Sequence, residues 1–524
     1  MGDDRHLPLK IAAAGPLLLA AAGGALAGVA LPPLGFPPLL WPALAVLWGL
    51  AGDPPVPGAA DRPAQRPLPC RGLVWGMAAV LVSHRWLLWL HPLDWVGVPG
   101  PLSLPLCGLL WLLCGLMGGA LVQIWLILVG RWDPRRGSTA LAAACLWGLA
   151  EVGLARGPLF WIGLGGSALP GDRALAGVAA LGGAGLVAAL QLFMGWCLWR
   201  AVTAVGARRR WLLATALVVL GSHLLGIAAL AGPEQELGAA RADLPPQQQR
   251  LLVLQPAIPT RQKFEADQQR RLLSQLADAE RRLAGLPTDQ RVDALLLPEG
   301  ALALDQPLPN PAPVEVLSGG FRREGEGLRS SLLRFPPGGQ DAAGWIDKHR
   351  VVPLGEWVPF AELWRWGGLS AVGGIGPGSP SRLLQRPGGA IGVAICYEVA
   401  DGTALARASR EGAGWLLATA NLDPYPALLQ GQFLALARLR AIETGRWLVS
   451  AANTGPSVAV DASGRLRGQL PAGRVGEGVL SLSRRTALTP YDRWGEGPLL
   501  LLLTLGAGVR LGLFRSRRPP GRPH

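Results

Sequence analysis

Eight apolar runs constrain the fold of this chain more than any other feature of its sequence. They cover residues 10–30, 37–51, 72–90, 103–130, 138–156, 174–199, 211–231 and 497–514. A bilayer core about 30 Å thick needs about 20 helical residues to cross it, and most of these runs are long enough. The sequence therefore predicts an α-helical membrane domain with seven helices in residues 1–231, and an eighth transmembrane helix in residues 495–524.

The charged residues are distributed as this interpretation requires. Residues 1–231 hold 23 charged side chains, whereas the remaining 293 residues hold 61. Residues 232–494 are therefore predicted to form a separate polar domain. The formal charge of +14 would also suit nucleic-acid binding, but that function needs basic residues clustered on one face, preferably with aromatic residues. The basic residues lie between apolar runs instead, so we predict a bilayer partner and no nucleic acid.

The basic residues also predict an orientation. With a cytoplasmic N-terminus, 17 Lys and Arg residues fall on the cytoplasmic side, including the Arg-rich C-terminal tail, and the opposite loops contain only Arg173. Positive charges are enriched on the cytoplasmic side of membrane proteins. Residues 232–494 are thus expected outside the cytoplasm. Among the charges in or near the runs, Glu151 and Arg85 are expected to face protein or an aqueous cavity, and a structural role is favoured over chemistry.

The polar domain has the pattern of a layered α/β fold. Apolar segments at 250–256, 292–297, 390–396, 414–420, 446–451, 456–460 and 477–483 indicate strands, and helices are expected at 265–285, 401–411 and 428–445. Strands that alternate with helices predict sheets covered by helices. Two segments rich in Gly and Pro, 301–345 and 360–388, are candidates for mobile loops, although passive connectors are about equally compatible with them.

Cys396 is the one cysteine of the polar domain, since the other five lie in residues 1–231. Such a thiol is either a buried apolar side chain or a reactive group. Its position at the end of an apolar strand, directly before Tyr397 and Glu398, favours the reactive group, because functional side chains emerge at strand ends in α/β domains.

Two further residues have the properties that thiol chemistry needs. Lys348 is one of only three lysines in a chain with 46 arginines. It lies in the segment DKHRVVPLGEWVPF, whose apolar residues, glycine and prolines indicate a defined conformation and not a solvated surface. Glu299 follows an apolar strand in LLLPEG, where burial is expected to raise the pKa of its carboxyl. Each is also compatible with a structural role. Together with Cys396 they supply a base, a cation for an oxyanion, and a nucleophile.

The sequence contains no P-loop, no dinucleotide fingerprint and no Cys/His cluster with metal-ligand spacing. Each of these motifs would supply a known way of holding a phosphate, a dinucleotide or a metal ion. We therefore predict neither a cofactor nor a metal.

These motifs resemble a known family. PEG at Glu299, DKHRVVPLGEWVP with Lys348 and Glu356, and ICYE at Cys396 are similar to the Glu–Lys–Cys motifs of the nitrilase superfamily. With helices before and after them, the chain resembles the bacterial apolipoprotein N-acyltransferases. The segments 436–464, 489–500 and 255–264 are similar to that family as well. The resemblance implies a nitrilase-like α-β-β-α sandwich outside the cytoplasm, on a multi-pass protein of the bacterial plasma (inner) membrane, with the catalytic domain on the periplasmic side.

The resemblance also implies a two-step acyl transfer. Glu299 would deprotonate Cys396, whose thiolate would take an acyl chain from a membrane phospholipid as a thioester. The N-terminal amine of an S-diacylglyceryl-cysteine lipoprotein would then accept the chain. Lys348 would stabilise the oxyanion, Glu356 would orient Lys348 or relay protons, and Tyr397 and Glu398 would shape the pocket.

The chain departs from the family pattern at three places. The segment Asn421 to Pro426 reads NLDPYP, Phe433 replaces a frequent histidine, and Phe264 stands where Trp is common. A membrane-anchored amidase or other hydrolase would share the three motifs, so it is the alternative function. A transporter or receptor would instead predict a paired helix pattern or several charges buried in the spans, and the sequence has neither.

Overall fold

The computed structural model describes residues 7–52, 70–94, 98–239, 248–262, 265–353, 355–357, 374–423 and 425–511. The predictions for Phe264, for residues 360–373 and for the tail from residue 512 onward lie outside the described residues.

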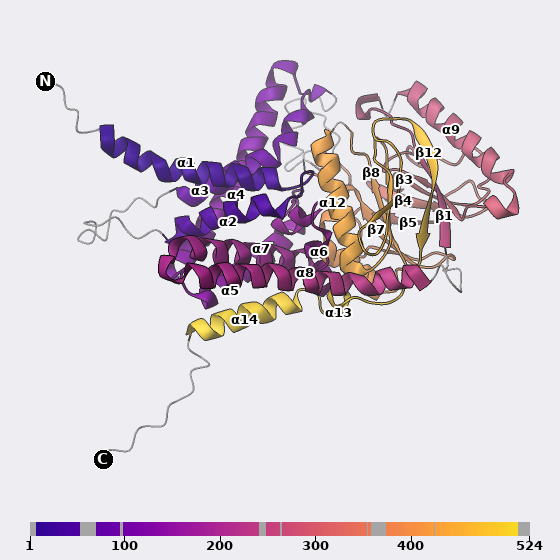
Figure 1. Cartoon of the computed structure of the whole chain (residues 1–524). Helices are drawn as coiled ribbons and strands as arrows, with labels where there is room; N and C mark the ends of the chain where they lie inside the picture. The colour runs from indigo at the N-terminus through magenta and orange to yellow at the C-terminus, as the bar shows by residue number, and fades with distance from the viewer. Residues whose placement is uncertain are drawn as a thin grey trace, which may run out of the picture.

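The apolar runs form helices that gather on one side of the molecule (Figure 1). They are α1 (Leu7–Ala30), α2 (Pro37–Gly52), α3 (Arg71–Ser83), α4 (Gly100–Arg131), α5 (Gly137–Ala155), α7 (Ala179–Thr203), α8 (Arg208–Ala239) and α14 (Gly497–Leu511). Among the described residues, four helical stretches are long and apolar enough to cross a membrane, in α4, α5, α7 and at 205–233. The other four are shorter apolar helices. Many leucines of α4, α8 and α14 are exposed, as expected of surfaces that face lipid.

Two predicted runs differ from the structure. The run at 72–90 is α-helical only to Ser83, whose hydroxyl donates to the Ala79 carbonyl at 2.9 Å. It continues as the 3-10 helix η1 (Arg85–Leu90). The run at 174–199 is divided into α6 (Arg173–Ala176), which Asp172 caps through the Leu175 amide at 2.9 Å, and α7, which has non-helical backbone at Gly182 and Gly183. Hydropathy alone cannot locate such breaks, since apolar residues lie on both sides of them.

The polar domain consists of two six-stranded sheets. The first has the order β12 (Gly476–Ser483), β1 (Gln248–Gln255), β2 (Ala294–Leu297), β3 (Glu315–Glu324), β4 (Gly327–Phe335) and β5 (Gly344–Asp347). The second has the order β11 (Leu466–Gln469), β10 (Val458–Val460), β9 (Leu448–Ala452), β8 (Leu416–Ala420), β7 (Ile391–Ile395) and β6 (Leu383–Leu384). Strands β7, β8 and β9 run parallel.

Helices cover both outer faces of the pair of sheets. α9 (Ala266–Ala284) lies outside the first sheet, and α11 (Gly402–Arg410) and α12 (Ala427–Thr444) lie outside the second (Figure 1). Short helices connect these elements, namely η3 (Leu164–Ala168), η4 (Val205–Ala207), η5 (Thr260–Gln262), η6 (Thr288–Gln290), η7 (Cys396–Ala400) and α13 (Pro490–Trp494). The predicted layered sandwich is confirmed.

Alternating side chains of the strands fill two separate cores. In β1, Leu251 and Val253 belong to the core between the sheets, whereas Leu252 and Leu254 pack with α9 residues such as Leu276. Successive residues of a strand point to opposite faces, so a strand covered on both sides is apolar throughout. This is why the sequence shows these strands as continuous apolar runs.

A third core joins the second sheet to the membrane helices. It contains Leu416 and Ala418 of β8, Leu436 of α12 and Val187 of α7. α12 therefore lies between the sandwich and the helical bundle, as Figure 1 shows.

The predicted loop at 301–345 is wrong in part, because it contains the hairpin of β3 and β4 and the strand β5. The sequence of β3, EVLSGGFRRE, has two glycines and ends in charged residues. Glycine and charged residues are uncommon in strands. Their presence here obscures the alternation of apolar and polar residues by which a strand is recognised in a sequence.

The predicted domain limit at residue 231 lies inside α8, which continues to Ala239. The predicted limit at residue 494 lies between α13 and α14.

Candidate active site

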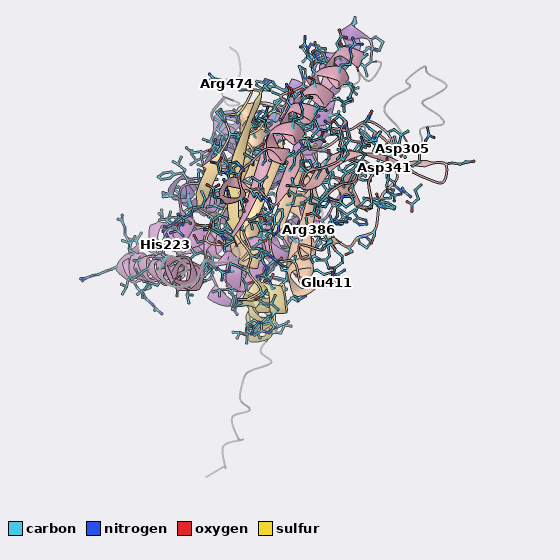
Figure 2. The ribbon with its side chains drawn as sticks, turned by 90° about the vertical axis from the view of Figure 1, so that its right-hand side faces the viewer. His223, Asp305, Asp341, Arg386, Glu411 and Arg474 are labelled. Atoms are coloured by element: carbon cyan, nitrogen blue, oxygen red, sulfur yellow. The ribbon has the colours of Figure 1, made fainter. Side chains whose placement is uncertain are left out.

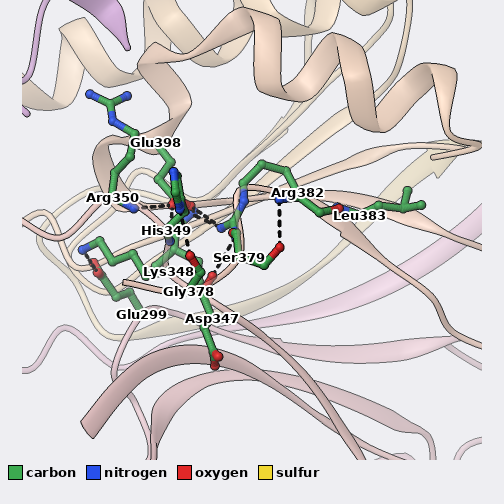
Figure 3. A network of polar contacts seen from close by, with 12 residues as sticks. Glu299, Asp347, Lys348, His349, Arg350, Gly378, Ser379, Arg382, Leu383 and Glu398 are labelled. Carbon is green, nitrogen blue, oxygen red and sulfur yellow. Dashed lines mark hydrogen bonds and ion pairs between the residues drawn. The ribbon is translucent and has the colours of Figure 1, made fainter. Parts of the chain in front are cut away.

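Three residues singled out in the sequence lie directly after strands. Glu299 is the second residue after β2, and Lys348 and Cys396 are the first residues after β5 and β7. The first two come from one sheet and the third comes from the other. The structure brings them together: Lys348 donates to Glu299 across 2.8 Å, and the charges of both act on the Cys396 thiol. Figure 3 shows Glu299 and Lys348 side by side.

Lys348 is a buried cation held by two carboxylates. Its side chain is 1% exposed, and Nζ donates to Glu299 Oε1 at 2.8 Å and to Glu356 Oε1 at 2.7 Å. Burial alone would lower the pKa of Lys348, but the two carboxylates outweigh it and raise that pKa well above its usual value. The ammonium therefore keeps its charge, which is what the stabilisation of an oxyanion requires.

Cys396 is held in an unusual backbone conformation. Its φ is 56°, in the left-handed region that residues other than glycine rarely adopt, and it starts η7 directly after β7. Such strain is found mainly at functional sites, where surrounding contacts maintain it. Desolvation raises the pKa of the Cys396 thiol, and the nearby charge of Glu299 raises it further. The resting thiol is therefore protonated at neutral pH and needs a base to become a nucleophile.

Glu356 and Tyr397 lie next to Lys348, as the sequence predicts. Glu356 Oε2 accepts from the Val352 amide at 2.8 Å, and burial raises the pKa of Glu356 although Lys348 opposes this. The Tyr397 hydroxyl donates to the Val351 carbonyl at 3.0 Å, and its ring centre is 5.7 Å from Lys348 Nζ. Burial raises the pKa of Tyr397 to about 12. Both residues hold the loop that carries Lys348.

Glu398 connects the lysine segment to the cysteine segment. Its carboxylate accepts from the amides of His349 at 2.7 Å and Arg350 at 3.0 Å on one side, and from the Ile395 amide at 2.9 Å on the other. Arg382 Nη1 neutralises it at 2.9 Å, and this ion pair is buried. Figure 3 shows the network. Glu398 therefore positions both segments, and Arg382 is a residue of the site that the sequence reasoning missed.

The segment after β8 orients Glu299. The Asn421 amide donates to Glu299 Oε2 at 3.1 Å, the Asn421 side chain donates to Thr260 Oγ1 at 2.8 Å, and Asn453 donates to Asn421 Oδ1 at 2.7 Å. Sequence reasoning missed these residues as parts of the site. The one signal for Asn421 was its position directly after a parallel strand.

Tyr425, in the same segment, lies close to the thiol. Desolvation raises the pKa of Tyr425, and the charges of Cys396 and Glu299 raise it further. Its ring centre lies 5.5 Å from that of Trp86 in η1, edge to face. Tyr425 therefore connects the surroundings of the thiol to η1 of the helical part.

The remaining residues singled out from the sequence pack in a core or make hydrogen bonds away from the reacting groups. Phe433 is 4% exposed within the core around α12. Glu151 accepts from the Leu164 amide and from the Trp147 indole, each at 2.9 Å. Arg85 differs, since its side chain is exposed and donates to the Val82 carbonyl at 2.7 Å near the end of α3.

We expect Gly319→Ala to displace Glu299. A Cβ at this position of β3 would lie 2.4 Å from Glu299 Cα and 2.4 Å from the Pro298 carbonyl oxygen, so the loop that carries Glu299 must move. Overpacking of this kind costs about 1–3 kcal/mol, measurable as a lower unfolding midpoint, and activity should fall with it. The control is Gly476→Ala at the start of β12, where a Cβ meets nothing within 4 Å. Equal stability and activity of both variants would contradict the expected crowding.

Two helix-covered sheets that bring a Glu, a Lys and a Cys together are typical of carbon–nitrogen hydrolases. The family model described as carbon-nitrogen hydrolase matches residues 318–486. This defines the class of the catalytic domain. Among solved structures, Nit3 of Saccharomyces cerevisiae, a member of the nitrilase superfamily, is 14% identical, with 45% of this chain and 90% of that chain covered and a TM-score of 0.34.

Relatives match almost the whole chain. An apolipoprotein N-acyltransferase of Prochlorococcus marinus (strain MIT 9313) is 46% identical over 99% of this chain and 98% of its own length. One from Parasynechococcus marenigrum (strain WH8102) is 45% identical, with 94% of this chain and 98% of its own length covered. The chain belongs to the apolipoprotein N-acyltransferase family, which confirms the resemblance found in the sequence. It is an acyltransferase with a catalytic domain of the carbon–nitrogen hydrolase type.

Proposed function

We propose that this protein transfers an acyl chain from a membrane phospholipid, through a thioester on Cys396, to the N-terminal amine of an S-diacylglyceryl-cysteine lipoprotein. The observation that carries the proposal is the buried pair of Glu299 and Lys348 beside a strained cysteine. The relatives, which are apolipoprotein N-acyltransferases, support the choice of acceptor.

In the first step, Glu299 takes the proton of the Cys396 thiol, whose raised pKa makes a base necessary. The thiolate attacks the ester carbonyl of the phospholipid, and the ammonium of Lys348 stabilises the resulting oxyanion. The C–O bond breaks, Glu299 returns the proton to the leaving oxygen, and a lysophospholipid departs. Cys396 then carries the acyl chain as a thioester.

In the second step, the free amine of the lipoprotein attacks the thioester carbonyl. Glu299 accepts the proton lost by the amine, and Lys348 again stabilises the oxyanion. The C–S bond then breaks, and the leaving Cys396 thiolate takes that proton back from Glu299. A thioester suits this order because it keeps the acyl group activated toward an amine. Glu356, Tyr397 and Glu398 support the reaction by positioning Lys348 and the backbone around it.

The site lies at the junction with the membrane helices. Tyr425 contacts Trp86 of η1, Arg261 donates to the Pro92 carbonyl at 3.2 Å, and Arg350 donates to the carbonyl of Gly157 beyond α5. Trp86 in turn lies 6.0 Å from His84, between ring centres. A thiol in this place can reach lipid esters near the bilayer surface.

A cavity in the helical bundle supports a lipid substrate. It has a volume of about 390 Å³ and lies among α1, α3, α4 and α5. Its lining is mostly apolar and includes Leu31, Val80, Leu121, Trp147 and Trp161. A pocket of this size and character is suited to an acyl chain. His84 also lines it, so the chain of ring contacts runs from the cavity through Trp86 to Tyr425.

We further propose that all eight apolar helices cross the bacterial plasma membrane and that the sandwich lies on its periplasmic side. The distribution of basic residues supports this orientation. The shorter apolar helices are compatible with crossing the membrane, since a bilayer can thin locally around a short span.

The test is incubation of the purified full-length protein with phospholipid and a synthetic diacylated lipopeptide. We expect a triacylated amide and one equivalent of lysophospholipid, both detected by mass spectrometry. Free fatty acid without amide would instead establish the alternative function, a membrane-anchored amidase or hydrolase that uses water as the acceptor.

A further inference from the structure

Two charged side chains of α12 are almost completely buried at the junction between the sandwich and the helical bundle. Arg440 is 2% exposed and Glu443 is 0% exposed. They are three residues apart, and Arg440 Nη1 lies 3.1 Å from Glu443 Oε2. Burying two charges is costly unless each makes several polar contacts. Their contacts show what the pair holds in place.

Glu443 reaches the membrane helix α7. Its Oε1 accepts from the Ala184 amide at 2.8 Å, directly after the break in α7 at Gly182 and Gly183, where φ of Gly183 is 73°. A helix break exposes amide groups that need acceptors. Glu443 satisfies one of them from the catalytic domain.

Arg440 reaches the segment that carries the nucleophile. Its Nη1 donates to the carbonyl of Ala400 at 3.3 Å, and Ala400 is the last residue of η7, which begins at Cys396. The contact is close-packed, because a Cβ on Gly402 would lie 1.9 Å from Arg440 Nη1 and 2.4 Å from Glu443 Oε2.

The pair therefore forms a continuous polar connection from α7, through Glu443 and Arg440, to η7. We propose that Arg440 and Glu443 are positioning residues, and that their ion pair fixes Cys396 relative to the membrane helices so that the thiol meets an ester held in the bilayer. This inference rests on the proposed role of Cys396 as the nucleophile. Neither residue touches the reacting atoms.

Several charged groups surround Glu443. Arg440 belongs to the same helix, Asp492 and Glu496 come from the segment of α13, and Glu151 and Asp401 line the same small cavity. Burial raises the pKa of Glu443 to about 7, against the opposing effect of Arg440. The ion pair is thus formed above pH 7 and is lost below it as Glu443 becomes neutral.

The test compares Glu443→Gln with the wild-type full-length protein in a single turnover, with thioester formation from phospholipid followed by intact-mass spectrometry. Above pH 8 the wild type has the ion pair and the variant does not, so we expect about a tenfold slower reaction, since small misplacements of reacting groups are costly. Below pH 6 both proteins have a neutral side chain, and the rates should converge within about threefold. Protonation of Glu299 affects both proteins equally and cancels in the ratio.

The matched control is Glu411→Gln, the same exchange at an exposed site of the sandwich, which Figure 2 places at its periphery. Its ratio to the wild type should stay near one at every pH. A second variant, Glu443→Asp, keeps the charge but shortens the reach to Ala184, and it should be slow at both pH values.

A ratio for Glu443→Gln that does not change with pH would overturn the proposal, as would a wild-type rate in Glu443→Asp above pH 8. A wild-type protein that forms no thioester would instead refute the role of Cys396, so the two failures are distinguishable.

Discussion

Replacement of Cys396 by alanine should abolish acyl transfer, with a loss of more than about 10³-fold, because no other group can carry the acyl chain. Cys396→Ser should be almost as inactive. A hydroxyl is a weaker acid than a thiol, and the surroundings already disfavour the ionised form of the thiol, whose pKa is raised. The measurement is intact-mass spectrometry with phospholipid alone, in which the wild type should gain the mass of one acyl chain and the variants should gain none.

Cys70→Ser is the control for loss of a thiol, since Cys70 is exposed at the start of α3. It should retain the acyl adduct and the transfer rate of the wild type. Transfer by the Cys396→Ala protein, or product formation without any adduct in the wild type, would exclude the thioester mechanism.

Lys348→Arg should lose activity by about 10²–10³-fold even though the charge is kept, because aimed donors in a buried site contribute on this scale. The Lys348 side chain is 1% exposed and its Nζ is held between Glu299 and Glu356 at 2.8 and 2.7 Å. A guanidinium is larger and planar and is not interchangeable with an ammonium in such a site. The expected signature is a lower rate of thioester formation at saturating phospholipid.

The control exchanges the same two residue types on the surface. Arg281 of α9 is 68% exposed, and Arg281→Lys should leave the rate unchanged. If Lys348→Arg reacts as fast as the wild type, Lys348 has only a structural role and another group must stabilise the oxyanion.

The positions of Glu299, Lys348 and Cys396 could be predicted because their signals are local. Each follows an apolar strand or stands out by residue type, and the structure brings all three together. The supporting residues are different. Arg382 and Asn421 act through contacts with Glu398 and Glu299, which are 16 and 122 residues away in the sequence. No periodicity or composition indicates such pairs.

The larger elements show the same limit. The strands of the sandwich that are buried on both faces were predictable from their continuous apolar sequence, whereas the β3–β4 hairpin was not, since its glycines and arginines obscure the strand pattern. Gly319 illustrates the reason, because it is needed for the close approach of Glu299 and not for the strand itself. Hydropathy indicated the membrane helices but not their ends, which depend on contacts such as the cap of α6 by Asp172.

The shared core around α12 has a consequence for how this protein melts. One face of α12 packs on the second sheet and the other packs on α7, so a single apolar cluster extends from Ala418 to Val187. Separation of the sandwich from the bundle would expose this cluster to water. The free energy of burial that is then lost stabilises both parts, so both would become less stable together. The sandwich and the helical bundle should therefore unfold in one cooperative transition, and lipid on the exposed leucines of α4, α8 and α14 should raise the temperature at which the catalytic sandwich unfolds.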